Sequence, residues 1–368
     1  MTNPLIRLGE LGQSPWYDYI TRDLVSEGEL ARLIAEDGLR GMTSNPTIFE
    51  KAVSGSQLYD DDLRRLADEG KHHAEIFDAF AVEDIRAACD LFAPLYQQAA
   101  NGDGTVSIEV APALANDTQA TLDEAQRLWR LVGRPNVLVK IPGTAAGLPA
   151  IEQATAAGVS VNITLLFSVD RYAEVIEAFL RGLEARMARG EPVDAINSVA
   201  SFFVSRVDTK IDPLLDRIGD PHGVRGRIAI ANAAKAYALF EETMASARWR
   251  ALAAQGARLQ RPLWASTSTK DPKYPDTYYV EALVAPYTVN TLPPETFDAY
   301  RDHGKPEVRI RDAMERADRD IAALERSGID LAQMTRELEE EGVRKFSASY
   351  DQLLAGIEAK AEALVGKG

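Results

Sequence analysis

Short stretches with β-strand character alternate with longer stretches of helical periodicity along most of this sequence. The predicted strands are residues 41–45, 106–110, 137–141, 160–164, 195–201, 262–266 and 285–290, with 17–20 as an eighth candidate. Such alternation indicates a parallel sheet whose strands are joined by crossover helices. Eight units of this kind close into a barrel whose functional sites lie at the carboxyl ends of the strands. The sequence therefore predicts an α/β protein, a (β/α)8 TIM barrel.

Local signals place several of the predicted helices. Ser26 and Glu29 have the spacing of a capping box, and Gly38 is the predicted end of the helix that follows. Residues 117–131 carry apolar side chains at helical spacing, and a further helix is expected at about 168–189.

The last part of the chain has helical periodicity almost throughout, from about residue 305 to 368. No internal repeat, low-complexity tract or Gly/Ser-rich linker divides the sequence. We therefore expect one domain, residues 1–368, made of the barrel and a helical C-terminal extension. A length of 368 residues is normal for a barrel with additional helices.

The chain is strongly acidic, with a net charge of −15 and a pI near 4.9. Such a chain repels nucleic acid and anionic membrane, so we expect neither as a partner, and an anionic ligand must meet a local cluster of Lys or Arg. No run of about 18 apolar residues and no secretory signal pattern is present. With the single cysteine Cys89, a cytoplasmic location is the default expectation. Monomer and homodimer both remain open.

Three consecutive predicted strands carry a polar residue on the face opposite their apolar one. In 106–110, the apolar residues alternate with Ser107 and Glu109. Lys140 has the equivalent place in the next strand, and Thr164 in the one after it. Side chains alternate across a strand, and the apolar face must meet the helices. Glu109, Lys140 and Thr164 are therefore expected to point into the barrel near the strand ends.

A lysine beside a glutamate in this position has two interpretations. One is a structural salt bridge, although a buried ion pair often stabilises a fold less than apolar packing would. The other is covalent chemistry, because burial disfavours the ammonium form of a lysine and the neutral amine attacks a ketone to form an imine. Three inward polar residues favour the second. Lys140 is then the nucleophile, and Glu109 moves protons through a water held by Thr164.

Asn45 stands where a short predicted strand ends and precedes Pro46. This pattern is typical of a helix start, with asparagine as the cap and proline at the first helical position. The same side chain is a candidate for contact with substrate hydroxyls, and the two roles are compatible.

No sequence motif indicates a bound metal or cofactor. Adjacent His72 and His73 would point about 100° apart on a helix, which suits metal binding poorly. The sequence has no Cys/His cluster, no phosphate-binding glycine loop and no dinucleotide-binding motif. Imine chemistry on a lysine needs no cofactor, so we expect none.

Several segments together resemble the transaldolase family, in its longer bacterial form with an extended helical C-terminus. They run in order over nearly the whole chain: GMTSNPTIF (41–49), VLVKIPGT (137–144), NITLLFS (162–168), SFFVSR (201–206), WASTSTKDP (264–272) and TVNTLP (288–293). The resemblance implies a class I aldolase-like (β/α)8 barrel. It also implies transfer of a dihydroxyacetone unit from sedoheptulose 7-phosphate to glyceraldehyde 3-phosphate, in the non-oxidative pentose phosphate pathway.

The resemblance further implies a role for individual residues. The Schiff-base lysine corresponds to Lys140, the proton-transferring glutamate to Glu109 and the water-positioning threonine to Thr164. The aspartate that accepts the C4-hydroxyl proton of the donor corresponds to Asp18, with Asp23 as the alternative.

Contacts to the sugar phosphates are implied in the same way. The expected substrate-binding residues are Asn45, Ser201, Phe203, Arg206, Ser266 and Lys270. Arg206 matches the phosphate-binding arginine of the family. Where some members have a second arginine, this chain has Lys270, which offers a point charge without the bidentate fork of a guanidinium.

Two other functions remain open on the sequence. A lyase similar to fructose 6-phosphate aldolase would release free dihydroxyacetone, but Glu109 counts against it because such aldolases usually lack that acid. A non-catalytic barrel that binds sugar phosphates would keep Arg206 and Lys270 and would have no need of Lys140.

Overall fold

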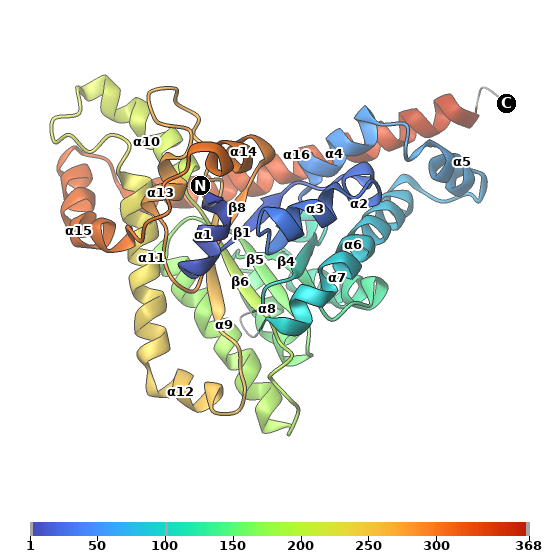
Figure 1. The fold of residues 1–368 in the computed structure, drawn as a ribbon, viewed down its shortest axis with the longest axis horizontal. Coiled ribbons are helices and arrows are strands. Elements are labelled where there is room, and N and C mark those ends of the chain that lie inside the picture. Colours follow the sequence, from blue (N-terminus) through green and yellow to red (C-terminus); the bar gives the residue numbers. More distant parts are fainter. Residues whose placement is uncertain (1–2, 100–101, 366–368) are drawn as a thin grey trace.

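Eight parallel strands close into a barrel in sequence order in the computed structural model, which describes residues 3–99 and 102–365 (Figure 1). The strands are β1 (Gln13–Asp18), β2 (Gly41–Thr43), β3 (Thr105–Glu109), β4 (Val137–Pro142), β5 (Val161–Leu166), β6 (Ser198–Phe203), β7 (Gln260–Ala265) and β8 (Thr288–Leu292). The sheet closes because β1 pairs with both β2 and β8. The prediction of a (β/α)8 barrel is confirmed.

Each predicted strand overlaps an observed one, and the first is the most displaced. It was expected at 17–20, whereas β1 begins at Gln13. The reason is that β1 starts with buried polar residues, which a hydrophobic pattern does not identify. The amide nitrogen of Gln13 donates to the backbone oxygen of Leu283 and to Thr288 Oγ1, at 2.8 and 2.9 Å. These bonds replace the water that the buried amide loses.

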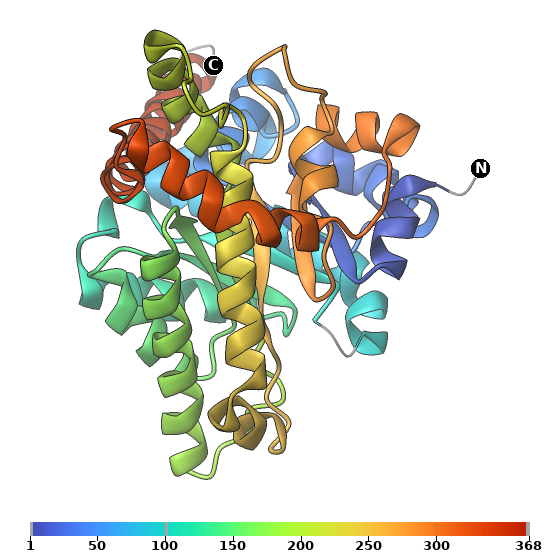
Figure 2. The same cartoon turned by 90° about the vertical axis from the view of Figure 1, so that its left-hand side faces the viewer.

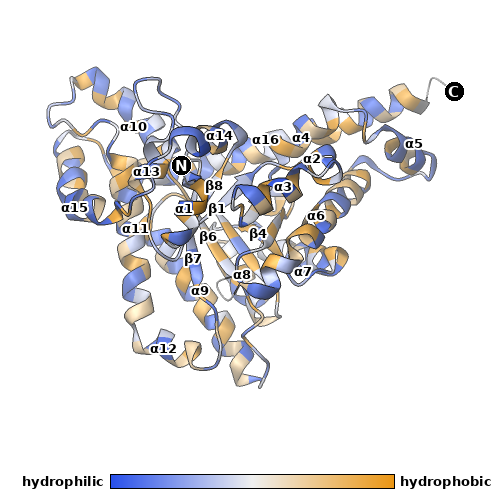
Figure 3. Cartoon of the chain, viewed as in Figure 1, coloured by the Kyte–Doolittle hydropathy of each residue, from blue (hydrophilic) through white to orange (hydrophobic). Residues whose placement is uncertain are grey.

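Helices follow the strands and cover the outside of the barrel. Before β6 they are α1 (Pro4–Glu10), α2 (Arg22–Ser26), α3 (Glu29–Glu36), α4 (Pro46–Gly55), α5 (Asp60–Asp68), α6 (His73–Gln98), the 3₁₀ turn η1 (Pro112–Leu114), α7 (Thr118–Val132), α8 (Gly147–Ala156) and α9 (Val169–Ala188). After β6 they are α10 (Ser205–Ile218), α11 (Ile228–Ala245), α12 (Ala247–Ala253), α13 (Tyr278–Ala282), α14 (Pro294–His303), α15 (Ile310–Arg326) and α16 (Leu331–Val365). Figure 3 shows hydrophobic and hydrophilic residues alternating along these helices. No helix of the described ranges is long and apolar enough to cross a membrane.

The capping box predicted at Ser26 and Glu29 is wrong. Ser26 is the last residue of α2, and α3 begins at Glu29 without a side-chain cap. Gly28 separates the two helices with a φ of 87°, a left-handed conformation that glycine adopts without strain. The predicted end of α3 is correct, since Gly38 follows its last turn with a φ of 68°.

The two C-terminal helices occupy different faces of the barrel. Figure 2 shows α15 lying across α11, on the side of the barrel, and the two helices are in contact. By contrast, α16 crosses the carboxyl ends of the strands and packs against α4, α5, α6, α10 and β5 (Figure 1). The end of the barrel where sites form is therefore covered by the last helix of the chain.

Candidate active site

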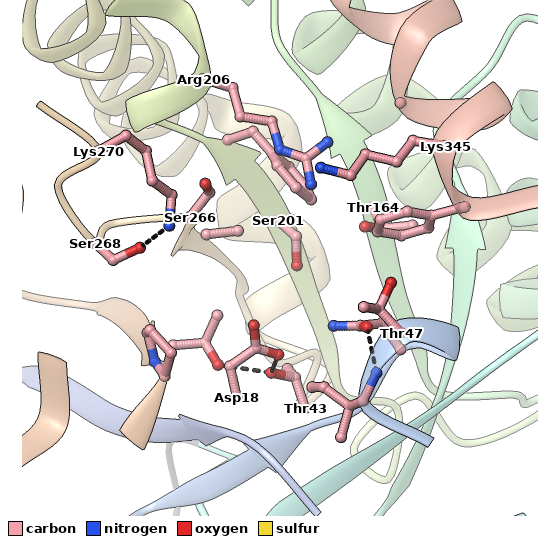
Figure 4. Close-up of a pocket in the computed structure, with 18 of the residues that line it drawn as sticks. Asp18, Thr43, Thr47, Thr164, Ser201, Arg206, Ser266, Ser268, Lys270 and Lys345 are labelled. Atoms are coloured by element: carbon pink, nitrogen blue, oxygen red, sulfur yellow. Dashed lines mark hydrogen bonds between the residues drawn. The ribbon is translucent and has the colours of Figure 1, made fainter. Parts of the chain in front are cut away.

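A cavity of about 810 Å³ opens at the carboxyl ends of the strands (Figure 4). Of the ten residues predicted for the site, those that line the cavity are Asp18, Asn45, Lys140, Thr164, Ser201, Phe203, Arg206, Ser266 and Lys270. Glu109 borders instead a second cavity of about 20 Å³, which is large enough for one water molecule. The structure therefore brings the predicted residues into one region.

Lys140 lies in β4 with only 5% of its surface exposed. The pairing of β3 with β4 places Glu109 directly beside it, and Lys140 Nζ lies 3.2 Å from Glu109 Oε2. Nζ also donates a hydrogen bond of 3.2 Å to the backbone oxygen of Ser44. Strand alternation thus predicted the inward direction of both side chains correctly.

Several buried polar atoms near Lys140 make no hydrogen bond of good geometry with the described residues. Burial raises the pKa of the Glu109 carboxyl, and the charge of Lys140 offsets part of that rise. Neither carboxylate oxygen of Glu109 meets hydrogen-bond geometry with any described residue, and neither does Thr164 Oγ1. Buried polar atoms are rarely left unpaired. Glu109, beside its ion pair with Lys140, and Thr164 therefore both have capacity to bond a substrate or a water molecule.

Asp18 is the last residue of β1 and faces the cavity from the side opposite Arg206 (Figure 4). Burial raises the pKa of the Asp18 carboxyl, while the positive charge of Lys140 lowers it. Asp18 Oδ1 accepts a hydrogen bond of 2.7 Å from Thr43 Oγ1. Asp23, the alternative, is exposed on α2 and lies outside the cavity wall. Of the two predicted aspartates, Asp18 is the one that lines the cavity.

Two threonines of the site were not predicted. Thr43 of β2 bonds Asp18 and shares a hydrogen bond of 2.6 Å with Thr291 of β8, and both threonines line the cavity. Each stands next to an apolar residue in its strand, Met42 or Leu292. The alternation that identified Lys140 contains the signal for these two residues as well.

Asn45, which follows β2, and Ser201 of β6 are each held by hydrogen bonds to other residues. Asn45 caps α4, since its Oδ1 accepts a hydrogen bond of 3.1 Å from the backbone nitrogen of Ile48. Its amide nitrogen has no partner among the described residues. Ser201 Oγ donates to Asn162 Oδ1 at 2.7 Å, and Asn162 donates in turn to Ser107 Oγ at 2.9 Å. This buried chain of hydrogen bonds fixes the direction of Ser201.

Arg206 and Lys270 form the basic end of the cavity. The Arg206 guanidinium lies 5.2 Å from the centre of the Phe203 ring, and burial lowers its pKa. Lys270 Nζ donates a hydrogen bond of 2.6 Å to Ser268 Oγ. Neither cation has an ion-pair partner within residues 3–99 and 102–365. Ser266 lies between them, and its backbone oxygen accepts from the backbone nitrogen of Ser205 at 2.9 Å.

Backbone strain marks two strand ends at this site. Leu165 in β5 has a φ of 62°, and Ser266 after β7 has a φ of 55°. Such left-handed values are unfavourable for residues other than glycine, and they concentrate at functional sites. The pairing of β5 with β6 changes register at the same place, between Ile163 and Leu166. No glycine is present to indicate either conformation in the sequence.

The charge of the cavity is opposite to that of the chain. Its wall contains six basic residues, Lys51, Lys140, Arg206, Lys210, Lys270 and Lys345, and three acidic ones, Asp18, Glu295 and Glu341. The whole chain has a net charge of −15. A basic cavity in an acidic protein selects anionic ligands. The contribution of Lys345 and Phe346, from α16, was not predicted.

Fold and cavity together define a (β/α)8-barrel protein with a buried lysine–glutamate pair and a basic pocket. The sequence pattern of the Transaldolase/Fructose-6-phosphate aldolase family matches residues 15–357. A transaldolase of Acidothermus cellulolyticus is 50% identical over 97% of this chain and 96% of its own length. Transaldolases of Frankia alni and Thermobifida fusca are 48% and 49% identical, over 97% and 96% of this chain and 97% of each relative. The chain belongs to the transaldolase/fructose-6-phosphate aldolase family.

Proposed function

We propose that this protein is a transaldolase that moves a dihydroxyacetone unit reversibly from sedoheptulose 7-phosphate to glyceraldehyde 3-phosphate. The observation that carries the proposal is the buried pair of Lys140 and Glu109, 3.2 Å apart, in a basic cavity at the carboxyl end of the barrel. Membership of the family and relatives named transaldolase over nearly the full chain support it. The products are erythrose 4-phosphate and fructose 6-phosphate, as in the non-oxidative pentose phosphate pathway.

The reaction starts with covalent attachment of the donor. Lys140 Nζ attacks the C2 carbonyl, and the carbinolamine loses water to give a protonated imine. Both steps move protons between nitrogen and oxygen. Glu109 is suited to this task because its raised pKa brings it closer to the working pH. The unpaired hydroxyl of Thr164 is suited to hold the water that connects Glu109 to the substrate.

Cleavage of the C3–C4 bond requires a base for the C4 hydroxyl. We assign this role to Asp18, which lines the cavity and is oriented by Thr43. As Asp18 takes the proton, the bond electrons flow into the imine and the aldose phosphate leaves. The enamine that remains on Lys140 adds to the acceptor aldehyde, and Asp18 returns the proton to the new hydroxyl. Hydrolysis of the imine then releases the product ketose.

The other predicted residues hold the two ends of the substrate. We assign Asn45, Ser201 and Phe203 to the dihydroxyacetone unit. Their place in the wall of the cavity that Lys140 also lines supports this assignment. Arg206, with Ser266 and Lys270, is assigned to the phosphate group, because two cations without ion-pair partners in the described chain suit a dianion.

Two further expectations concern the whole molecule. A cytoplasmic location is supported by the single cysteine, Cys89, which is buried and unpaired. The barrel and its C-terminal extension are proposed to form one domain, since α16 supplies part of the cavity wall.

The decisive experiment is reductive trapping with borohydride in the presence of fructose 6-phosphate. The expected result is a three-carbon adduct on Lys140, found by mass spectrometry of peptides, and its loss in Lys140→Met. An adduct on another lysine contradicts the mechanism. Binding of fructose 6-phosphate without adduct or turnover would indicate a non-catalytic barrel.

Product analysis separates transfer from lysis. With fructose 6-phosphate alone, a transaldolase releases little free dihydroxyacetone. With sedoheptulose 7-phosphate as the donor, a transaldolase forms erythrose 4-phosphate at a rate that depends on the aldose acceptor, glyceraldehyde 3-phosphate. Release of free dihydroxyacetone at the same rate with and without acceptor would assign the chain to the aldolase branch of its family instead.

A further inference from the structure

The last helix brings a cation into the cavity that the family resemblance did not indicate. Lys345 of α16 lines the cavity together with Arg206 and Lys270. Figure 4 shows these three side chains reaching into the pocket from three separate elements, α16, α10 and the segment after β7. The position of Lys345 therefore depends on how firmly α16 is held against the barrel.

Gly342 allows α16 to approach the barrel closely. A β-carbon at this position would lie 2.9 Å from Leu165 Cδ2 and 3.5 Å from Phe167 Cε2, and the first distance is too short for an ordinary contact. Glycine in the middle of a helix is less favourable than alanine, so its presence here has a packing reason. Gly342 lies one turn before Lys345, so this close approach sets the height of Lys345 above the strands.

Polar contacts hold α16 in place before this turn. Lys210 of α10 forms ion pairs with Glu337 and Glu341, at 2.8 and 2.6 Å. Arg171 of α9 pairs with Glu339 at 3.3 Å. These contacts fix the first half of α16 to helices that follow β5 and β6.

Contacts after Lys345 complete the attachment. Thr47 Oγ1 donates a hydrogen bond of 2.9 Å to Ser349 Oγ, and Lys360 pairs with Asp60 at 2.6 Å. Lys345 thus lies on a segment that is attached on both sides, and its main chain has little freedom to leave the cavity.

Phe346 sets the rotation of α16 about its own axis. It is 5% exposed, and its ring centre lies 5.7 Å from Lys140 Nζ and 5.9 Å from the Arg206 guanidinium. With Phe346 buried between these cations, the preceding side chain of Lys345 is directed to the basic end of the cavity.

The charge of Lys345 is not neutralised by the protein. Lys345 has no ion-pair partner in the described ranges, whereas its neighbour Arg344 approaches Glu340 at 3.8 Å. Lys345 also acts on Lys270: partial burial lowers the pKa of Lys270, Glu295 raises it, and the charges of Arg206 and Lys345 lower it further. Three cations that repel one another in one pocket would be stabilised by a dianion.

We propose that Lys345 is a third cation of the phosphate subsite, which binds the phosphate group of the sugar substrates together with Arg206 and Lys270. The proposal rests on the proposed function, since it names a specificity residue for the same reaction. A phosphomonoester carries close to two negative charges and three acceptor oxygens, which matches three cations approaching from three directions.

The test compares Lys345→Ala and Lys345→Arg with the wild type and with Arg344→Ala. Arg344 is a matched control because it is the adjacent exposed cation of α16 and lies outside the cavity wall. The measurements are kcat and KM for fructose 6-phosphate, the same constants for unphosphorylated fructose, and competitive inhibition by inorganic phosphate.

The expected result is a rise of roughly 5- to 20-fold in the KM for fructose 6-phosphate in Lys345→Ala, since solvent screens part of the interaction of an exposed ammonium. The preference for fructose 6-phosphate over fructose, as a ratio of kcat/KM, should fall by the same factor, and phosphate should inhibit more weakly. Lys345→Arg should retain most of the preference for fructose 6-phosphate, and Arg344→Ala should match the wild type. An unchanged preference in Lys345→Ala, or an equal loss in Arg344→Ala, overturns the proposal.

Direct binding keeps this test independent of turnover. If the wild-type protein shows no transfer, the proposed function fails, but calorimetric titration with inorganic phosphate still tests the subsite. Weaker phosphate binding in Lys345→Ala than in Arg344→Ala supports the proposal, and equal binding in the two variants overturns it.

Discussion

Asp208 is a buried carboxyl group on α10, two residues after Arg206. Its Oδ1 accepts a hydrogen bond of 2.8 Å from the backbone nitrogen of Ala229, and its Oδ2 accepts one of 3.0 Å from Tyr279. Burial raises the pKa of Asp208 to about 7, and the nearby charge of Asp212 contributes to the rise. Because α10 carries Arg206 into the cavity, the ionisation of Asp208 bears on the stability of the phosphate end of the site.

The effect on stability follows from the difference between the folded and unfolded states. Unfolded, the carboxyl of Asp208 titrates near its ordinary pKa of 3.8, so between about pH 4 and 7 the folded state binds the additional proton. The free energy of unfolding must then fall as pH rises through this range, by up to ~4 kcal/mol in all; above it the loss is complete, and this group causes no further change with pH. Of this, ~2 kcal/mol falls between pH 5.5 and 8.

Asp208→Asn removes the ionisation and keeps an acceptor oxygen for the backbone of Ala229. We expect its free energy of unfolding, relative to the wild type, to increase by ~2 kcal/mol from pH 5.5 to pH 8 in urea titrations. Asp216→Asn is the control on the same helix: the hydrogen bond from Arg225 lowers the pKa of the Asp216 carboxyl, so it is ionised in both states throughout this range. Parallel stability curves for Asp208→Asn and the wild type would refute the reasoning.

Three further variants test other parts of the site. Glu109→Gln should lower kcat/KM by roughly 10²- to 10⁴-fold, as expected for loss of a proton-transferring group, and an effect below tenfold in steady-state assays would remove Glu109 from that role. Asp18→Asn should still form the imine with fructose 6-phosphate but not cleave it, so borohydride should trap a six-carbon adduct; a three-carbon adduct at the wild-type rate would contradict the assignment. Gly342→Ala should lower the thermal midpoint despite the better helix propensity of alanine, because its β-carbon would meet Leu165 at 2.9 Å, and a raised midpoint would show that α16 relaxes without cost.

The alternation of apolar and polar residues in the sequence predicted the features that depend on strand geometry alone. Alternation within single strands was sufficient to find the barrel and to direct Glu109, Lys140 and Thr164 inward, since these facts depend on the strand geometry alone. The same argument extends to Thr43, whose neighbour Met42 is buried on the opposite face. A site at the carboxyl ends of the strands then follows from the architecture.

Features that depend on long-range packing were not predictable in this way. The helical pattern of α16 indicates which of its faces is apolar but not which surface of the barrel that face covers. Lys345 is therefore indistinguishable from an ordinary exposed lysine in the sequence, although it lines the same cavity as Lys140, about 200 positions earlier in the chain. The left-handed conformations of Leu165 and Ser266 could not be predicted for a related reason: the surrounding packing imposes them, and the local sequence does not favour them.

The residues assigned to covalent chemistry and those assigned to phosphate binding lie on different kinds of structural element. The groups assigned to covalent chemistry lie on strands, where ladder hydrogen bonds on both sides hold them, as Lys140 is held between β3 and β5. The cations assigned to phosphate lie on α10, α16 and the segment after β7, outside the sheet of the barrel. A transferase must keep one reacting atom fixed while the sugar phosphates exchange. Moving α16 by a change at Gly342 should therefore raise KM for phosphorylated substrates. The rate of imine formation with dihydroxyacetone, which carries no phosphate, should stay close to that of the wild type. An equal loss in both reactions would show that α16 also positions the strands, and would contradict this separation.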